Sequence, residues 1–274
     1  MVRNYVGTDR NDFFKANPTN ESWHMAGGFG DDTLIGGDKN DTLHGGGFSH
    51  DSLVGGKGSD TYYIDSYDDV IVEKPYEGYD TVYSRVSHTL DSNFEQLLLI
   101  PDNRAIYATG NSSNNYLGGN NRNNKMYGLA GQDNLKGEDG NDYLEGGDGF
   151  DTLYGGNGND TLVGNRKGDG TSFEFDRLYG GAGSDTFVLG DKNVVISYND
   201  RDGADRAEIY DFQPGVDKLQ LGGDRKYHVV NNNNLYFDHD RNGALNSGDD
   251  LIAIVHGVTE SQLISAVNSA VYKG

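Results

Sequence analysis

The chain has 274 residues and a formal net charge of −21 at pH 7, because 43 Asp and Glu residues outnumber 22 Lys and Arg residues. So acidic a chain disfavours nucleic acid and anionic membranes as partners. It contains no cysteine, which excludes disulfides and thiolate metal sites. With 41 glycines and a hydrophobic content of 34%, it is too polar for a conventional core of this length, but a regular repeat argues against disorder.

The first block, residues 1–63, repeats the pattern Gly-Gly-x-Gly-x-Asp-x-Leu-x, most clearly at 27–35. Nine residues suit one glycine turn and one very short strand, which favours a parallel β-roll or β-helix. Side chains alternate along a strand, so the eighth residue of each repeat is expected to point inward. One inward column makes a narrow core that only stacked repeats can bury. In this block the column reads Leu34, Leu43, Leu53 and Tyr62.

The turn of each repeat has the composition of a metal site. Glycine adopts positive φ without steric cost, which lets successive carbonyl oxygens face one point, and the aspartate adds charge. Oxygen ligands without sulfur or imidazole describe a hard-cation site, and a large number of flexible oxygens favours calcium over magnesium. The turns are therefore predicted to bind Ca²⁺.

Residues 64–109 leave the nonapeptide but keep alternating apolar residues, as in 70–72. This stretch is predicted to form strand-rich connecting coils that continue or brace the roll. Its acidic cluster has two interpretations, a further ion site or a solvated acidic loop. The cluster consists of Asp65, Asp68, Asp69 and Glu73.

The second block, residues 110–188, has its clearest copy at 155–163. Asn115 and Asn124 stand where aspartate is expected, and are predicted to hold metal-free turns by hydrogen bonds. A seven-residue insertion within 164–174 interrupts the period. The inward column of this block reads Leu135, Leu144, Leu153, Leu162, Leu178 and Phe187.

Residues 189–274 are predicted to form a cap on the roll. Within it, 238–249 fits the twelve-residue EF-hand loop, although its flanks resemble strands more than helices. The alternative is an Asx-rich hairpin turn. The predicted ligands are Asp238, Asp240, Asn242, the backbone of Ala244, and Asp249. A capping box at Thr259 to Gln262 indicates a short terminal helix.

On these nonapeptides the chain resembles the RTX (repeats-in-toxin) family of hemolysin-type calcium-binding repeat proteins. The resemblance implies an all-β, right-handed parallel β-roll (β-solenoid) with two nonapeptides per turn and calcium between the loops of repeats i and i+2. It pairs Asp31 with Asp51, Asp41 with Asp60, Asp133 with Asp151, Asp142 with Asp160, and then Asp151 and Asp160 with Asp176 and Asp185. The glycines that complete these turns are Gly28, Gly30, Gly37, Gly56, Gly58, Gly140, Gly147, Gly149, Gly156, Gly158, Gly181 and Gly183.

No nucleophile elbow, zinc motif or phosphate loop is present, so no catalytic residue is assigned and the chain is predicted not to be an enzyme. The resemblance implies export, typically by type I secretion. The leading hypothesis is a secreted module that folds on binding calcium and serves adhesion or matrix assembly, contacting extracellular polysaccharide or cell-surface components. The alternative is an accessory module, or a relative, of a secreted carbohydrate-active enzyme such as an alginate epimerase. Ice binding is disfavoured because the ninth repeat position is irregular.

Overall fold

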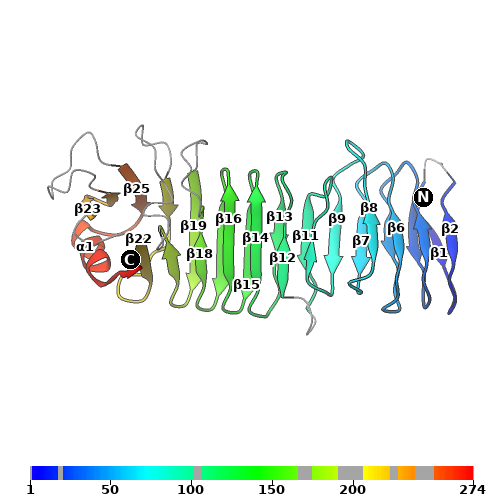
Figure 1. Cartoon of the computed structure of the whole chain (residues 1–274), viewed down its shortest axis with the longest axis horizontal. Helices are drawn as coiled ribbons and strands as arrows, with labels where there is room; N and C mark the ends of the chain where they lie inside the picture. Colours follow the sequence, from blue (N-terminus) through cyan, green and yellow to red (C-terminus); the bar gives the residue numbers. More distant parts are fainter. Residues whose placement is uncertain are drawn as a thin grey trace. The chain divides into compact units, whose positions relative to one another are not determined.

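The computed structural model describes residues 2–17, 21–101, 106–165, 175–190, 206–222, 228–237 and 250–273. The chain divides into two compact units, Met1–Asn120 and Asn121–Gly274. Within each unit, short strands stand side by side and alternate with turns (Figure 1). The all-β parallel roll predicted from the repeat is therefore confirmed.

The strands of the first unit are parallel and belong to three sheets. One sheet has the order β1-β3-β5-β7-β9-β11-β13, and the other two carry β2-β4-β6-β8 and β10-β12. Their bounds are β1 Val2–Val6, β2 Phe13–Lys15, β3 Ser22–Ala26, β4 Thr33–Ile35, β5 Thr42–His44, β6 Ser52–Val54, β7 Thr61–Ile64, β8 Val70–Val72, β9 Thr81–Ser84, β10 His88–Thr89, β11 Gln96–Leu99, β12 Tyr107–Thr109 and β13 Tyr116–Gly118. Residues 64–109 thus contain strands, as predicted.

The second unit repeats this arrangement with longer strands. One face has the order β15-β17-β19-β21-β25-β24-β23, in which the last two pairings are antiparallel, and the other has β14-β16-β18-β20-β22-β26. Their bounds are β14 Lys125–Ala130, β15 Asn134–Asp139, β16 Tyr143–Asp148, β17 Thr152–Asn157, β18 Thr161–Val163, β19 Phe175–Ala182, β20 Thr186–Val188, β21 Arg206–Ile209, β22 Lys218–Gly222, β23 His228–Asn231, β24 Asn234–Phe237, β25 Asp250–Val255 and β26 Val271–Lys273.

The core is the single inward column expected at the eighth repeat position. Every predicted member of that column is fully buried. The strand register places equivalent repeat positions side by side: Leu135 of β15 pairs with Leu153 of β17. Strands therefore pair two repeats apart, which is the arithmetic of two nonapeptides per turn.

The inserted residues leave this register intact. Leu153 of β17 pairs with Leu178 of β19, although the two are separated by the insertion within 164–174. At the carboxyl end, α1 (Glu260–Ser269) begins with the predicted capping box at Thr259 and packs on β22 and β23. Leu263 and Val267 are its buried residues, so this face of the helix is apolar and covered.

The spacing of stacked turns depends on glycine. Gly158 has a φ of 136°, and a Cβ on it would lie 1.6 Å from the carbonyl oxygen of Gly140. A side chain there would push two turns apart as well as strain the backbone. Gly37, by contrast, leaves a Cβ at ordinary contact distance, its nearest neighbour 3.8 Å away.

Gly158→Ala is therefore expected to destabilise the roll by about 2 kcal/mol or more, because positive φ and a backbone clash combine. Gly37→Ala is the control and should change stability by well under half of that. Thermal unfolding followed by circular dichroism in saturating calcium measures both. Equal melting temperatures for the two variants would contradict this account of the turn.

Candidate metal centre

The aspartates of the turns form hydrogen-bonded columns along the roll. In the second unit the backbone N–H of Asp142 donates to Oδ1 of Asp160 at 2.8 Å, and that of Asp160 donates to Oδ1 of Asp185 at 2.9 Å. In the parallel column, Asp133 donates in the same way to Asp151 at 2.8 Å, and Asp151 to Asp176 at 3.0 Å. All the carboxylates that accept these bonds are buried. The structure thus brings together each of these pairs as predicted.

The first unit carries the same ladder. The N–H of Asp41 donates to Oδ1 of Asp60 at 2.7 Å, which confirms that these two residues are neighbours. In the facing column the N–H of Asp32 donates to Oδ1 of Asp51 at 2.8 Å. A column of like charges a few ångströms apart is unfavourable unless counter-charge is supplied.

The predicted pairing of Asp31 with Asp51 is wrong by one residue. Asp32 holds the column position, whereas Asp31 is exposed and accepts a hydrogen bond from the N–H of His50 at 3.1 Å. The reason is the alternation of the strand, which places residues two apart on one side. Asp32, two residues before the buried Leu34, faces the inside of the roll, and Asp31 faces solvent.

The second oxygen of each column carboxylate lies within its own turn. A Cβ on Gly137 would lie 2.4 Å from Oδ2 of Asp142 and equally close to the carbonyl oxygen of Gly155 two repeats later. A carboxylate oxygen and a carbonyl oxygen thus approach the same point. The positive φ that this turn needs is found at Gly28, Gly30, Gly56, Gly58, Gly140, Gly147, Gly149, Gly156, Gly158, Gly181 and Gly183.

Several of these Oδ2 atoms are buried without any hydrogen-bond donor. They belong to Asp32, Asp60, Asp142, Asp160 and Asp185. A buried carboxylate oxygen without a partner costs several kcal/mol unless a cation satisfies it. Carboxylate and carbonyl oxygens are the ligands of a hard cation, so the residues present fit calcium. When bound, the ion would supply the missing counter-charge between neighbouring turns.

Electrostatics supports the same conclusion. Burial, opposed by a backbone hydrogen bond and reinforced by Asp160, raises the pKa of Asp142 to about 7. Burial likewise raises the pKa of Asp160 and of Asp51 to about 6, and that of Asp60 to about 8. Without a cation the fold therefore favours the protonated form of carboxyls that are ionised in the unfolded chain at neutral pH.

The turn at Gly37 differs from the others. Gly37 does not have positive φ, and its N–H donates to Oδ2 of Asp41 at 2.6 Å. Oδ1 of the same carboxylate accepts from Trp23 N–H at 2.6 Å, so both oxygens are satisfied by the backbone. Lys39 replaces the second-half glycine in this turn, which explains the altered loop.

The turn at Asn115 is held by side-chain hydrogen bonds, as predicted. Oδ1 of Asn115 accepts from the N–H of Asn111 at 2.7 Å, and its side-chain amide donates to the carbonyl of Phe94 at 3.0 Å. An amide supplies both a donor and an acceptor, so this turn closes without added charge. In the second unit, the backbone N–H of Asn124 donates to Oδ1 of Asp142 at 2.7 Å, as the N–H groups of the column aspartates do.

Three members of the columns lie beyond the nonapeptide pattern: Asp80 and Asp217 were not predicted from the sequence, and Asp69 was named only as part of an acidic cluster. Asp69 accepts from the N–H of Asp51 at 3.2 Å, Asp80 from that of Asp60 at 2.7 Å, and Asp217 from that of Asp185 at 3.0 Å. The sequence signal was available, since each precedes an inward apolar residue by two positions. The proposed EF-like ligands Asp238, Asp240, Asn242, Ala244 and Asp249 lie outside the described residues.

A parallel roll whose glycine turns stack buried aspartates is a calcium-binding β-roll. The family model described as the RTX calcium-binding nonapeptide repeat matches residues 26–62, 46–71, 109–144, 136–166 and 173–193. The chain thus carries RTX calcium-binding nonapeptide repeats, and it binds several calcium ions. Repeat domains of this kind are structural calcium-binding modules rather than catalytic ones.

No curated protein matches the chain. Among solved structures, extracellular lipase LipA from Serratia marcescens aligns with 17% identity and a TM-score of 0.25, over 96% of this chain and 39% of the lipase. The chain therefore spans well under half the length of that lipase. In the described part of the chain, no helix has the length and apolarity needed to cross a membrane.

The corrected column position gives a matched pair of variants. Asp32→Asn removes the charge of a buried column carboxylate and is expected to weaken calcium binding in that turn about tenfold or more, because calcium affinity depends on ligand charge. Asp31→Asn removes the same charge from an exposed neighbour and should leave the binding isotherm unchanged. Calcium titration calorimetry compares them. A stronger effect of Asp31→Asn would restore the original pairing.

The raised carboxyl pKa values predict an unusual pH dependence. The calcium-free fold retains protons that the unfolded chain releases above about pH 4, so its stability should fall as pH rises from about 4 to about 7. In chelator, the β-sheet signal and melting temperature should be higher at pH 5 than at pH 7.5. Saturating calcium should reverse this order because bound carboxylates must be deprotonated. A melting temperature that rises with pH in chelator would contradict the prediction.

Proposed function

We propose that this protein is exported, folds when it meets calcium outside the cell, and works there as a structural, adhesion or matrix-interaction module. The observation that carries the proposal is the set of buried column carboxylates whose second oxygens have no donor, such as those of Asp142 and Asp160. At the low calcium of a cytosol, sites of millimolar type are empty and the columns repel one another. Metal binding then becomes folding free energy.

Export by type I secretion is part of the proposal. A chain that stays extended until it reaches high calcium suits passage through a narrow channel. Calcium also replaces the disulfides that stabilise many secreted domains, and the chain has no cysteine. No disulfide-forming machinery is then needed for the module to become stable outside the cell.

The first experiment tests calcium-dependent folding. The full chain in chelator is expected to show little β-sheet signal at pH 7.5 and to gain it on addition of millimolar calcium, with a large rise in melting temperature. Magnesium at the same concentration is the control and should produce a much smaller change, since these turns offer many flexible oxygens. If calcium changed neither the spectrum nor the melting temperature, the proposal would be wrong.

A second candidate is an accessory module of a carbohydrate-active enzyme, or a relative of such an enzyme. It is favoured by a row of half-buried rings on the outer face of the second unit. Tyr154, Tyr179 and Tyr210 stack at 4.7 and 4.8 Å, and His256 continues the row at 4.4 Å. Lys136 lies 5.7 Å from the Tyr154 ring, beside a shallow depression that both residues line. Aromatic edges with a nearby cation provide a surface for polyhydroxylated or acidic ligands.

A panel of polysaccharides that includes alginate distinguishes the two candidates. In calcium buffer an accessory module is expected to bind or modify at least one of them, and Tyr179→Ala should lose that binding while retaining the calcium-induced β signal. Binding to no polysaccharide, together with self-association or adhesion to cell surfaces, would favour the structural module.

A further inference from the structure

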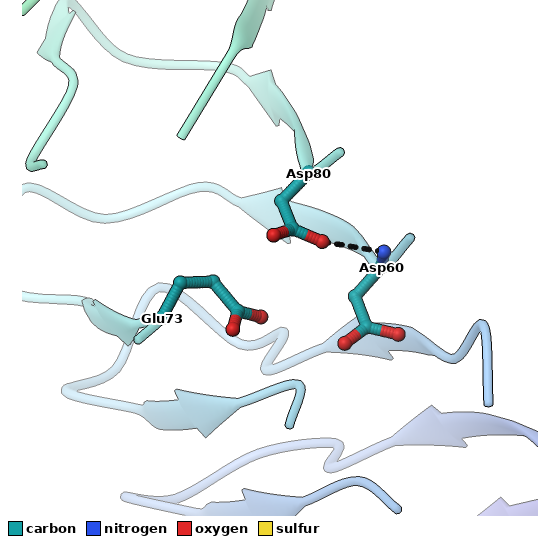
Figure 2. A group of neighbouring side chains, drawn as sticks. All are labelled: Asp60, Glu73 and Asp80. Atoms are coloured by element: carbon teal, nitrogen blue, oxygen red, sulfur yellow. Dashed lines mark hydrogen bonds between the residues drawn. The ribbon is translucent and has the colours of Figure 1, made fainter. Parts of the chain in front are cut away.

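Three buried carboxylates from different strands converge in the first unit. Asp60 precedes β7, Glu73 follows β8 and Asp80 precedes β9, and one oxygen of each lies within 4.8 Å of the others. Figure 2 shows the three carboxyl groups facing a common space. The exposed fractions are 1% for Asp60, 7% for Glu73 and 1% for Asp80, so solvent does little to screen their charges.

Two oxygens in this cluster have no hydrogen-bond partner. Oδ1 of Asp60 accepts from the N–H of Asp41, and Asp80 Oδ1 accepts from the N–H of Asp60, both at 2.7 Å. Oδ2 of Asp60 and Oε2 of Glu73 are buried and receive nothing. A buried, unpartnered carboxylate oxygen is a ligand position that lacks its cation.

Glu73 enters this space because it stands where the repeat has its first glycine. β4 and β6 are followed by Gly36 and Gly55, whereas β8, which pairs with β6, is followed by Glu73. Glu73 reaches back over Gly55, where a Cβ would lie 2.3 Å from Oδ2 of Asp60 and 2.4 Å from Oε1 of Glu73. A side-chain carboxylate thus occupies space that other turns keep for backbone alone.

Tyr62 holds Glu73 in this position. It replaces the leucine of the inward column, is fully buried, and bonds through its hydroxyl to Oε1 of Glu73. The same hydroxyl accepts the N–H of Gly55 at 2.6 Å. One oxygen of Glu73 is therefore fixed, and the other remains directed at the shared space.

We propose that Asp60, Glu73 and Asp80 form a three-carboxylate site for a divalent cation of the calcium class, and that it binds more tightly than the repeat turns and fills first. Glu73 and Asp80 lie beyond the family's matched segments in this region, which end at residue 71, so the repeat accounts for only one of the three ligands. An additional carboxylate raises calcium affinity through ligand charge. The site stands apart from the proposed extracellular role, since it requires only that the chain bind calcium.

The test compares Glu73→Gln with Asp91→Asn in the full chain. Each removes one negative charge, but Asp91 is exposed and is not among the candidate ligands. Equilibrium dialysis against buffered free calcium measures ion stoichiometry and the affinity of the first ion bound. Glu73→Gln is expected to weaken binding of that first ion about tenfold or more. Asp91→Asn should match the unsubstituted chain. Tyr62→Phe should give a smaller loss, because it removes only the hydroxyl that holds Glu73 in place.

A second readout separates a metal ligand from a structural hydrogen-bond partner. In chelator at pH 5, where the calcium-free fold is expected to be most stable, a metal ligand contributes no stabilisation. Glu73→Gln should therefore melt at the same temperature as the unsubstituted chain or higher. Unchanged stoichiometry and first-ion affinity would overturn the proposal. Weakened binding with a lower melting temperature in chelator would overturn it too, because Glu73 would then be holding the turn rather than the ion. Calcium-induced folding of the unsubstituted chain tests the proposed function separately.

Discussion

The structure depends on one constraint: carboxylates are buried in columns beside a core that is only one or two side chains wide. Each column aspartate gives one oxygen to the N–H of a turn two repeats earlier, as Asp160 does for Asp142. That bond sets the spacing of the turns but cannot neutralise the charge. The cation that removes the remaining cost is therefore as much a part of the core as Leu144 or Leu153.

The strand and the turn of each repeat contribute differently to the fold. The apolar column provides non-directional burial, so it accepts apolar side chains of different shape, as where Tyr62 or Phe187 replaces leucine. The polar turn provides direction and register, because glycine at positive φ brings backbone within contact of backbone. Neither the apolar column nor the turn is sufficient to stabilise the fold alone, since the core is too thin and the turns are too highly charged.

Much of this could be predicted from the nonapeptide, since its period fixes both which residues point inward and which repeats are neighbours. The pairs of Asp41 with Asp60 and of Asp142 with Asp160 follow from that period alone. Asp31 was misassigned by one position, because both the repeat counted from Gly27 and the alternation counted back from Leu34 place the column aspartate at Asp32. Glu73 could not be placed, because its role depends on Tyr62 and on a register between β6 and β8 that no repeat specifies.

The undisturbed register after the insertion has a wider consequence. Asp133 and Asp151 are 18 residues apart and Asp151 and Asp176 are 25 apart, yet the N–H to carboxylate bond is the same in both pairs. The pairing of column aspartates therefore depends on the number of turns between them and not on the number of residues. Since closing a longer loop costs only about 0.6 kcal/mol per doubling of its length, segments of new sequence can be hung from a turn with little loss of stability. A roll of this kind is a scaffold on which surface loops can diversify while the columns of aspartates keep their register.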